Sequence, residues 1–392
     1  MTIFFEDSRQ EIGIDWLDVT LKFDNPGGSK AKQLYRGPWD DVRTRLIELL
    51  ETTLGVKNPM ETEKNTGKGY NHILEYDNGL ELQYHDELCY MGIAISFNGD
   101  TLRRYRQQGY TDRDIIQVLE WSYEDKPNDL LQEQVEWHRH GTRVDLAIDY
   151  YNTGLDVDTL ATKTTRTKTI EVWFQQYDKE TQEYRERISL AEPYAMMNDG
   201  NFETLYVGRP GGTFQARIYN KFLEQTSKGA WIPEDVHAWT RAELVLKGDW
   251  TESFIRSGME TANDDEFGRL IYAYFLQKVM FKYAKSGREH EMTKDMKKQA
   301  KGATMVRYSK AKPDDFLRAK FEHMMGGSGL IGFLQILKGL EAEGHPGLRE
   351  QFWELARTAS EERDMPKDIA IRMASILALA SHEDYRLPFG NR

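Results

Sequence analysis

Three short segments of the chain alternate apolar and polar residues with a period of two, and each places a reactive side chain two positions after an arginine. The segments are RVDLAID at 143–149, ARIYNK at 216–221 and RAELVLK at 241–247. Such alternation predicts a β-strand with one buried face. If the three strands share a sheet, their polar side chains meet on one face of it. The side chains that would then gather are those of Asp145, Asp149, Arg217, Tyr219, Lys221, Arg241 and Glu243.

The acidic residues of these segments are candidate metal ligands. Asp145 and Asp149 share one face of the predicted strand 142–150, because alternate residues of a strand point the same way. We expect them to lie close enough along the strand to share a Mg²⁺ or Mn²⁺ ion, which prefers oxygen ligands and would neutralise a phosphate. Glu243, from another strand, would complete the site. The alternative is a polar face exposed to solvent, or an ion pair with Arg143.

Tyr219 is a candidate nucleophile because of its neighbours. It is one of 20 tyrosines, most of which we expect to be packing residues. Arg217 and Lys221 lie two residues to either side, so we expect all three side chains on one strand face. A phenol has a pKa near 10 and needs cations or a metal to favour the phenolate during attack. A tyrosyl-phosphate bond would conserve the energy of a cleaved phosphodiester and allow it to be rejoined.

Other motifs are weaker or absent. His138 and His140 flank Arg139 and form a second, less favoured candidate for metal ligation. The single cysteine, Cys89, excludes an internal disulfide and a multi-cysteine zinc site. The sequence contains no GxxxxGK[ST] loop, so we do not expect the protein to use ATP. It also lacks an apolar run of about 18 residues and a basic-then-apolar leader, which predicts a cytoplasmic protein without a membrane partner.

The charge of the chain is acidic overall but unevenly distributed. The net charge is -12, which argues against indiscriminate coating of DNA. Residues 278–320 nevertheless contain 13 basic and 5 acidic residues, a net charge of +8. A local basic surface is therefore compatible with the composition.

Periodicity divides the chain into two parts. Strand patterns and a few helices predict an α+β region over residues 1–262. Apolar residues at helical spacing then predict helices at 264–284, 312–325, 330–343, 346–362 and 366–380. We therefore expect an α+β domain at 1–262, followed by a mainly helical region at 263–392 that serves DNA binding or oligomerisation.

The order of these segments resembles the Rep_trans, or replication initiation factor, family of rolling-circle initiators and relaxases. The similar segments run in order over roughly residues 12–255. They are IDWLDVTLKF, GIAISFNGDTLRRY, TRVDLAIDYY, TLYVGRPGGTFQARIYNKFLEQ and WTRAELVLKGDW. The resemblance implies an antiparallel-sheet nicking domain distantly related to the HUH endonucleases. It places the nucleophile on Tyr219 and acidic, metal-binding positions on Asp145, Asp149 and Glu243.

The resemblance also implies a function. The expected protein is a rolling-circle replication initiator or relaxase that nicks and rejoins DNA through a covalent 5′-phosphotyrosine, with Mg²⁺ or Mn²⁺. Arg217, Lys221 and Arg241 would stabilise charge or contact phosphates. Its partners would be origin DNA, a host helicase, a host polymerase and a second copy in a homodimer. The alternative is a non-catalytic origin-binding regulator on the same scaffold.

Overall fold

A computed structural model describes most of the chain as two compact units, Met1–Ser309 and Lys310–Arg392, each of which is considered by itself. The described residues are 4–23, 39–63, 69–88, 91–119, 137–178, 183–189, 192–198, 200–303, 305, 330–342 and 346–362.

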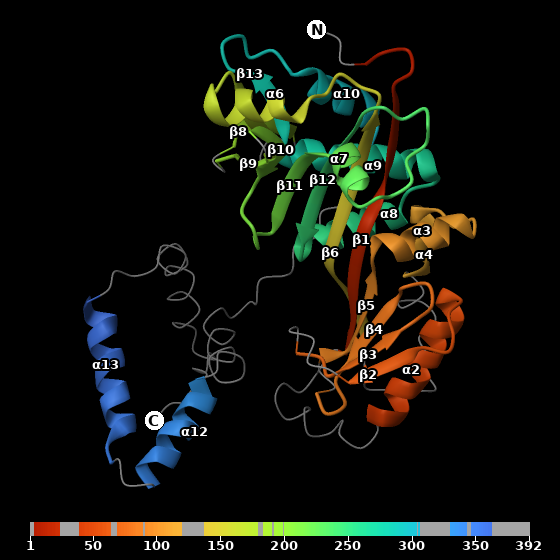
Figure 1. Cartoon of the computed structure of the whole chain (residues 1–392). Helices are drawn as coiled ribbons and strands as arrows, with labels where there is room; N and C mark the ends of the chain where they lie inside the picture. Colours follow the sequence, from red (N-terminus) through yellow and green to blue (C-terminus); the bar gives the residue numbers. More distant parts are fainter. Residues whose placement is uncertain are drawn as a thin grey trace. The chain divides into compact units, whose positions relative to one another are not determined.

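The first unit is built on a large antiparallel sheet (Figure 1). Its described strands follow the order β2-β3-β4-β5-β1-β6-β12-β11-β10-β9. The strands are β1 (Arg9–Phe23), β2 (Met60–Glu63), β3 (His72–Glu75), β4 (Glu81–Tyr84), β5 (Ile93–Phe97), β6 (Trp137–Tyr151), β9 (Tyr194–Asn198), β10 (Asn201–Val207), β11 (Phe214–Asn220) and β12 (Trp239–Lys247). All three segments with the arginine pattern therefore form neighbouring strands, β6, β12 and β11, near the middle of the sheet.

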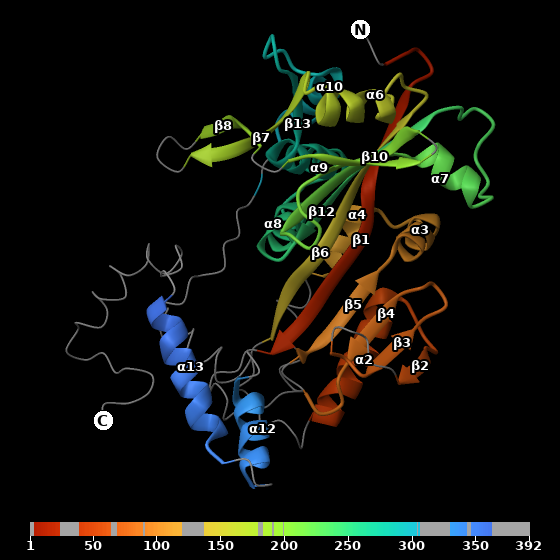
Figure 2. The same ribbon diagram turned by 60° about the vertical axis from the view of Figure 1, so that its left-hand side comes forward.

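One face of the central strands carries the apolar residues predicted by the alternation. Val144, Leu146 and Ile148 of β6 are completely buried, as is Leu244 of β12. Helices α8 (Asp249–Met259) and α9 (Asp264–Lys278) pack over this face, on one side of the sheet (Figure 2). The ring of Phe254 in α8 makes edge contacts with rings of α9. Burial of this apolar surface stabilises the sheet and leaves the opposite face to the polar residues.

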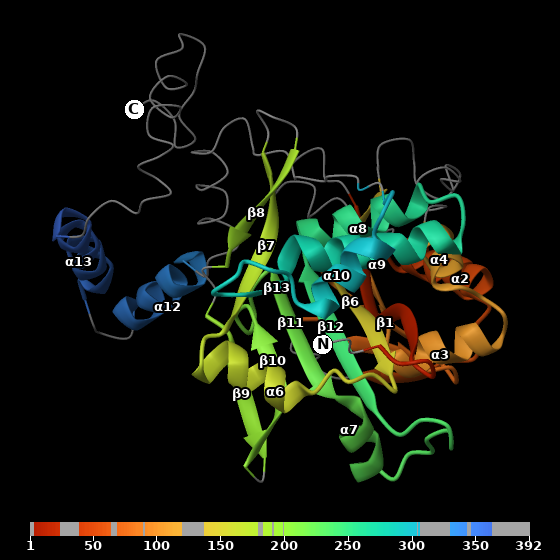
Figure 3. The same cartoon turned by 90° about the horizontal axis from the view of Figure 1, so that it is seen from above.

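The remaining elements of the first unit are short. The helices are α2 (Trp39–Leu54), α3 (Gly99–Gln107), α4 (Asp112–Val118), α6 (Val157–Ala161), the π-helical turn η3 (Thr162–Arg166), α7 (Lys221–Ser227) and α10 (Glu291–Gln299). A smaller sheet has the order β13-β7-β8, with β7 (Ile170–Asp178), β8 (Glu183–Ile188) and β13 (Met280–Tyr283). Figure 3 shows α10 beside α9 and β13, against which it packs.

The chain departs from the sequence prediction after residue 262. The helix predicted over 264–284 ends at Lys278, because Val279 has an extended backbone with φ of −144° and the next residues pair with β7. The run VMFKY is rich in β-branched and aromatic residues, which favour a strand once a partner edge is present. The predicted boundary after residue 262 falls inside the first compact unit, since α9 packs against the sheet.

The second unit contains two described helices, α12 (Leu330–Ala342) and α13 (Leu348–Glu362). They contact each other through Phe333 and Phe352, whose rings meet edge to face at 5.4 Å between centroids. The helices predicted at 312–325 and 366–380 lie outside the described residues. None of the helices described in either unit has the length and apolarity needed to cross a membrane.

Candidate active site

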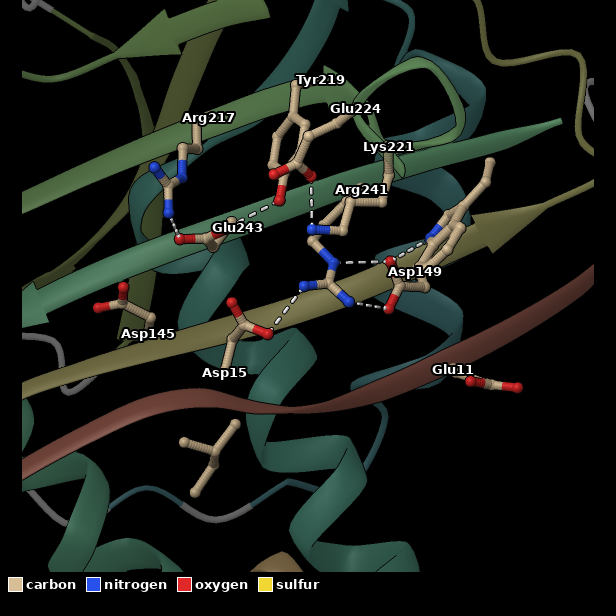
Figure 4. A network of polar contacts seen from close by, with 12 residues as sticks. Glu11, Asp15, Asp145, Asp149, Arg217, Tyr219, Lys221, Glu224, Arg241 and Glu243 are labelled. Atoms are coloured by element: carbon tan, nitrogen blue, oxygen red, sulfur yellow. Dashed lines mark hydrogen bonds and ion pairs between the residues drawn. The ribbon is translucent and has the colours of Figure 1, made fainter. Parts of the chain in front are cut away.

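The register of the central strands gathers the predicted polar side chains on one face of the sheet. Arg241 of β12 lies opposite Asp149 of β6 on one side and opposite Tyr219 of β11 on the other. Glu243, two residues further along β12, lies opposite Arg217 of β11. Figure 4 shows these side chains together over the translucent strands. The sequence pattern thus places these side chains next to one another on one face, where hydrogen bonds and ion pairs join them in neighbouring groups.

Arg241 and Asp149 form one of these groups. The Arg241 guanidinium donates to both oxygens of Asp149, with both N–O distances at 2.8 Å, and to Oδ1 of Asp15 at 2.8 Å. Trp239 Nε1 donates to Asp149 Oδ1 at 2.5 Å. The side chains of Arg241 and Asp149 are only 12% and 10% exposed. Asp149 therefore serves to hold Arg241 in place, and the paired carboxylates raise the pKa of the guanidinium despite its burial.

This arrangement predicts a structural cost for Asp149→Asn. Removing the Asp149 charge leaves the buried Arg241 guanidinium with the weaker compensation of its single bond to Asp15, so we expect a loss of up to about 3–5 kcal/mol in the free energy of unfolding. The melting temperature should fall by roughly 2–4 °C for each kcal/mol. Thermal unfolding without added metal measures this fall in melting temperature.

Asp145→Asn provides the matched control for that measurement. Its partner Arg143 is 34% exposed, so water can solvate the arginine once the carboxylate is gone. The loss in the free energy of unfolding should therefore be smaller for Asp145→Asn than for Asp149→Asn. Equal melting temperatures for the two variants would contradict the positioning role of Asp149.

Tyr219 and Arg217 share the carboxylate of Glu243. The Tyr219 hydroxyl donates to Glu243 Oε2 at 3.3 Å, and Arg217 bonds to Oε1. Glu243 is 0% exposed, which differs from the solvent-exposed polar face that the sequence left open as the alternative for these acids. The difference arises because Glu243 lies on an interior strand and the side chains of two neighbours cover it. Its carboxylate is thus the only proton acceptor bonded to Tyr219 among the hydrogen bonds of the described residues.

The electrostatics of this pair differ from the expectation for an activated phenol. Burial raises the pKa of Glu243, an effect that Arg217 opposes and that Asp15 and Asp145 reinforce. Burial also raises the pKa of Tyr219, and the adjacent Glu243 carboxylate raises it further, while Arg241 lowers it. These effects favour the protonated phenol, so a nucleophilic role for Tyr219 would require a proton acceptor, and the bonded Glu243 carboxylate lies in the position for it.

Asp145 lies in a separate ion pair with Arg143. Arg143 binds both of its oxygens, with N–O distances of 2.8 and 2.5 Å, and the Asp145 side chain is 3% exposed. Burial raises the pKa of Asp145, Arg143 and Arg217 oppose this, and the charge of Asp15 adds to the rise. Asp15, Asp145 and Glu243 therefore repel one another on the same face of the sheet.

The three predicted metal ligands are not brought together. Asp145 and Asp149 are separated by four residues on β6, which corresponds to about 13 Å along a strand. Each predicted ligand is instead bound to its own arginine. Within the described ranges, no group of three or more His, Cys, Asp or Glu side chains is arranged to hold a metal ion. The set of Asp145, Asp149 and Glu243 therefore does not fit a shared ion as it stands.

Lys221 reaches the site from a helix rather than from a strand. Strand β11 ends at Asn220, whose side chain caps α7 by accepting from the backbone N–H of Leu223. Lys221 is the first residue of α7, and its Nζ lies 2.5 Å from Glu224 Oε2. Its Nζ is also 5.5 Å from the centre of the Tyr219 ring. The expected same-face strand position is wrong, but the cation still lies beside the tyrosine.

A pocket of about 860 Å³ opens over Tyr219. Arg217, Lys221 and Glu243 line it, together with Asn98 and Asp100 at the start of α3. Asn98 caps α3 through a bond to the backbone N–H of Thr101. The charged side chains of the pocket lining are three cations, Arg217, Lys221 and Lys228, and five carboxylates, Asp15, Asp100, Glu203, Glu224 and Glu243.

Asp15 is the residue of this site that sequence reasoning missed. The pairing of β1 with β6 shifts between Ile14 and Trp16, so Asp15 lies in a bulge and reaches Arg241. A bulge redirects one side chain and cannot be inferred from simple alternation. The available signal was an aspartate within the segment IDWLDVTLKF, at a position where alternation alone predicts no special role.

A comparison with protein families agrees with the resemblance noted in the sequence. Residues 140–325 match the model of the replication initiation factor family, a stretch that includes most of β6 and all of β11 and β12. The structure is similar to that of a rolling circle replication initiator protein from Geobacillus stearothermophilus, with 16% sequence identity and a TM-score of 0.48. That similarity covers 77% of this chain and 100% of the other. No curated protein sequence matches this chain.

Proposed function

We propose that the protein initiates rolling-circle replication or DNA transfer by nicking and rejoining one DNA strand through Tyr219. The observation that carries this proposal is the bond between the Tyr219 hydroxyl and the buried carboxylate of Glu243, at the base of an open pocket whose lining includes the cations Arg217, Lys221 and Lys228 among several carboxylates. The match to the replication initiation factor family, over residues 140–325, includes β11 and β12, which carry Tyr219 and Glu243.

The proposed step is a transfer of a phosphodiester to tyrosine. Tyr219 Oη attacks the phosphorus and forms an Oη–P bond, while the bond from phosphorus to the 3′ oxygen breaks. The phenolic proton passes to Glu243, and the departing 3′ oxygen takes a proton from water to become a hydroxyl. The 5′ phosphate remains on Tyr219. The reverse reaction, with a 3′ hydroxyl as the nucleophile, reseals the strand.

The cations of the site would stabilise the DNA phosphate and not only the Tyr219 phenol. Arg217 is 37% exposed and faces the pocket, so it can contact a phosphate while it holds Glu243. Lys221 lines the same pocket on the other side of the tyrosine. Arg241 is held more deeply by Asp149 and acts on Tyr219 through its charge. Positive charge placed before reaction stabilises the charge that develops on the transferred phosphate.

We further propose a divalent ion, Mg²⁺ or Mn²⁺, as a cofactor. Its site would be near Asp15 and Asp145, whose carboxylates repel each other beside Glu243 and whose charge a cation would neutralise. When bound, such an ion supplies polarisation of the phosphate. Asp145 would have to exchange Arg143 for the ion, and Arg143 is 34% exposed, so water can solvate it after the exchange. Asp149 is not included, because its partner Arg241 is buried and Trp239 also binds it.

Metal binding can be measured without any DNA reaction. Mn²⁺ at about 100 times its dissociation constant stabilises a protein by about 2.7 kcal/mol. We therefore expect the melting temperature to rise by roughly 5–10 °C. Asp145→Asn should remove most of this rise, and Asp149→Asn should retain it relative to its own metal-free value. No rise in the unsubstituted protein would contradict the metal proposal.

A non-catalytic origin-binding regulator remains the second candidate, since arginines pair with the predicted metal ligands and the Tyr219 pKa is raised. The deciding experiment incubates the protein and Mn²⁺ with a randomised library of labelled single-stranded oligonucleotides. Denaturing electrophoresis isolates covalent complexes, and mass spectrometry identifies the modified residue. A phosphonucleotide on Tyr219 supports the nicking function. Specific binding without any adduct supports the regulator.

The predicted partners follow from the proposed step. The substrate would be origin DNA with a single-stranded nick site. A host helicase and polymerase would extend the released 3′ end, because the sequence carries no phosphate-binding loop for a motor of its own. The proposed role of residues 263–392 in DNA binding or in a homodimer is a prediction that rests on charge and helical pattern alone.

A further inference from the structure

Two tyrosines form a stacked pair at the end of the sheet nearest the pocket. Tyr194 of β9 and Tyr206 of β10 have ring centroids 4.8 Å apart and ring planes within 7° of parallel. Tyr206 also lines the pocket over Tyr219. Tyr194 is 38% exposed, although a stacked aromatic pair normally contributes most when it is buried. The pair therefore presents an aromatic surface beside the proposed nucleophile.

The register of the sheet connects this pair to the reactive residues. Glu243 lies opposite Arg217, Arg217 opposite Tyr206, and Tyr206 opposite Tyr194. Directly paired residues point to the same face, so the row runs across the polar face from β12 to β9. Neighbouring strands are about 4.8 Å apart, which puts the two tyrosines about 5 and 10 Å beyond the strand of Arg217.

The tyrosines are not needed to complete the apolar core. Leu205 and Val207, on either side of Tyr206, are completely buried on the opposite face of β10. On β9, the last strand in the described sheet order, Met196 and Met197 are 59% and 47% exposed. The surface around the pair is thus open and partly apolar. Gln215 Nε2 donates a hydrogen bond of 3.0 Å to the Tyr194 hydroxyl at the edge of this pair.

We infer that Tyr194 and Tyr206 form a stacking platform for the bases of single-stranded DNA next to the scissile phosphate. Proteins that hold single strands combine aromatic rings for the bases with cations that follow the backbone. Here Arg217 lies next to Tyr206 in the row, and Lys228 lines the same pocket with 62% of its side chain exposed. This inference rests on the proposed function, because it assumes that a single strand enters the pocket over Tyr219.

The test separates stacking from phosphate binding. Fluorescence anisotropy compares the affinity for an oligothymidylate of about 12 nucleotides with that for an abasic strand of equal length and charge. We expect the protein to prefer the strand with bases. Tyr194→Leu and Tyr206→Leu keep apolar bulk but remove the rings, and each should reduce this preference by about 5-fold to 100-fold. Binding to the abasic strand should be unchanged.

Matched variants separate a loss of stacking from a loss of folding. Tyr194→Phe and Tyr206→Phe retain the rings and should retain the preference for bases. Tyr110→Leu is the control, since Tyr110 is 46% exposed and lines a different pocket, next to Arg106 and Asp112. Equal binding of both strands by the unsubstituted protein would overturn the inference, as would an unchanged preference in both leucine variants with normal melting temperatures.

The inference and the proposed chemistry can fail independently. Tyr219→Phe leaves the platform in place, so that variant should still prefer the strand with bases even though it forms no adduct. A normal preference for bases without any adduct on Tyr219 would reject the nicking proposal and keep the platform. An adduct on Tyr219 without any preference for bases would reject the platform and keep the nicking proposal.

Discussion

Tyr219→Phe is expected to abolish the covalent protein–DNA complex and to lower DNA nicking by at least about 10³-fold, the scale seen when a nucleophile is removed. The substitution deletes only the hydroxyl oxygen that would form the bond to phosphorus. The ring remains, with Lys221 near its face. Because the phosphate-facing cations are unchanged, DNA affinity should stay within a few-fold of that of the unsubstituted protein.

The measurement has three parts: relaxation of supercoiled DNA, denaturing electrophoresis for the adduct, and anisotropy for binding. Tyr110→Phe removes an exposed hydroxyl elsewhere and should leave all three unchanged. The loss of the bond from Tyr219 to Glu243 leaves a buried acceptor without this partner, which costs about 1–3 kcal/mol. A melting curve therefore accompanies the assays. An adduct of normal yield in Tyr219→Phe would exclude Tyr219 as the nucleophile.

Glu243→Gln should slow adduct formation by about 10²–10⁴-fold, the usual contribution of a positioned proton acceptor. The amide keeps the size of the side chain and can still accept a hydrogen bond from Tyr219, but it cannot take the phenolic proton. Single-turnover measurement of adduct formation at fixed Mn²⁺ gives the rate directly. Glu224→Gln is the matched control, because Glu224 lines the same pocket and binds Lys221 and Lys228 rather than Tyr219.

The rate of adduct formation should depend on pH in a defined direction. Glu243 must be ionised to accept a proton, and burial raises its pKa above the usual range of a glutamate. The rate should therefore fall as the pH drops through this raised pKa, at a higher pH than an exposed glutamate would give. In Glu243→Gln this acid limb should disappear. If the rate and the acid limb both survive the substitution, another group accepts the proton.

The local sequence was sufficient to predict the strands that carry the site. The apolar residues of RVDLAID and RAELVLK alternate, and both segments are strands with those residues in the core. The glycines at residues 208–212 favour a turn, and β10 pairs with β11 on either side of them. Period-two patterns succeed because the direction of a side chain in a strand depends only on its own backbone.

Local sequence was insufficient where a residue depends on a distant partner. The pattern beyond Asp264 predicts a helix to residue 284, but pairing with β7 converts its end into β13. Lys221 follows the strand pattern of ARIYNK, yet the cap formed by Asn220 starts α7 there. In both cases a tertiary contact or a cap competes with the local periodicity and prevails.

The amino-acid sequence by itself determined which side chains share a face: Asp145 with Asp149, Arg217 with Tyr219, and Arg241 with Glu243. Only the tertiary structure decided which of them meet, because the order and register of β6, β12 and β11 are set by contacts between residues far apart in the chain. That register joins Asp149 to Arg241 as a buried support and gives Tyr219 its carboxylate. It also buries Glu243, and burial changes the proton affinity of an acid in a way that no single strand can reveal.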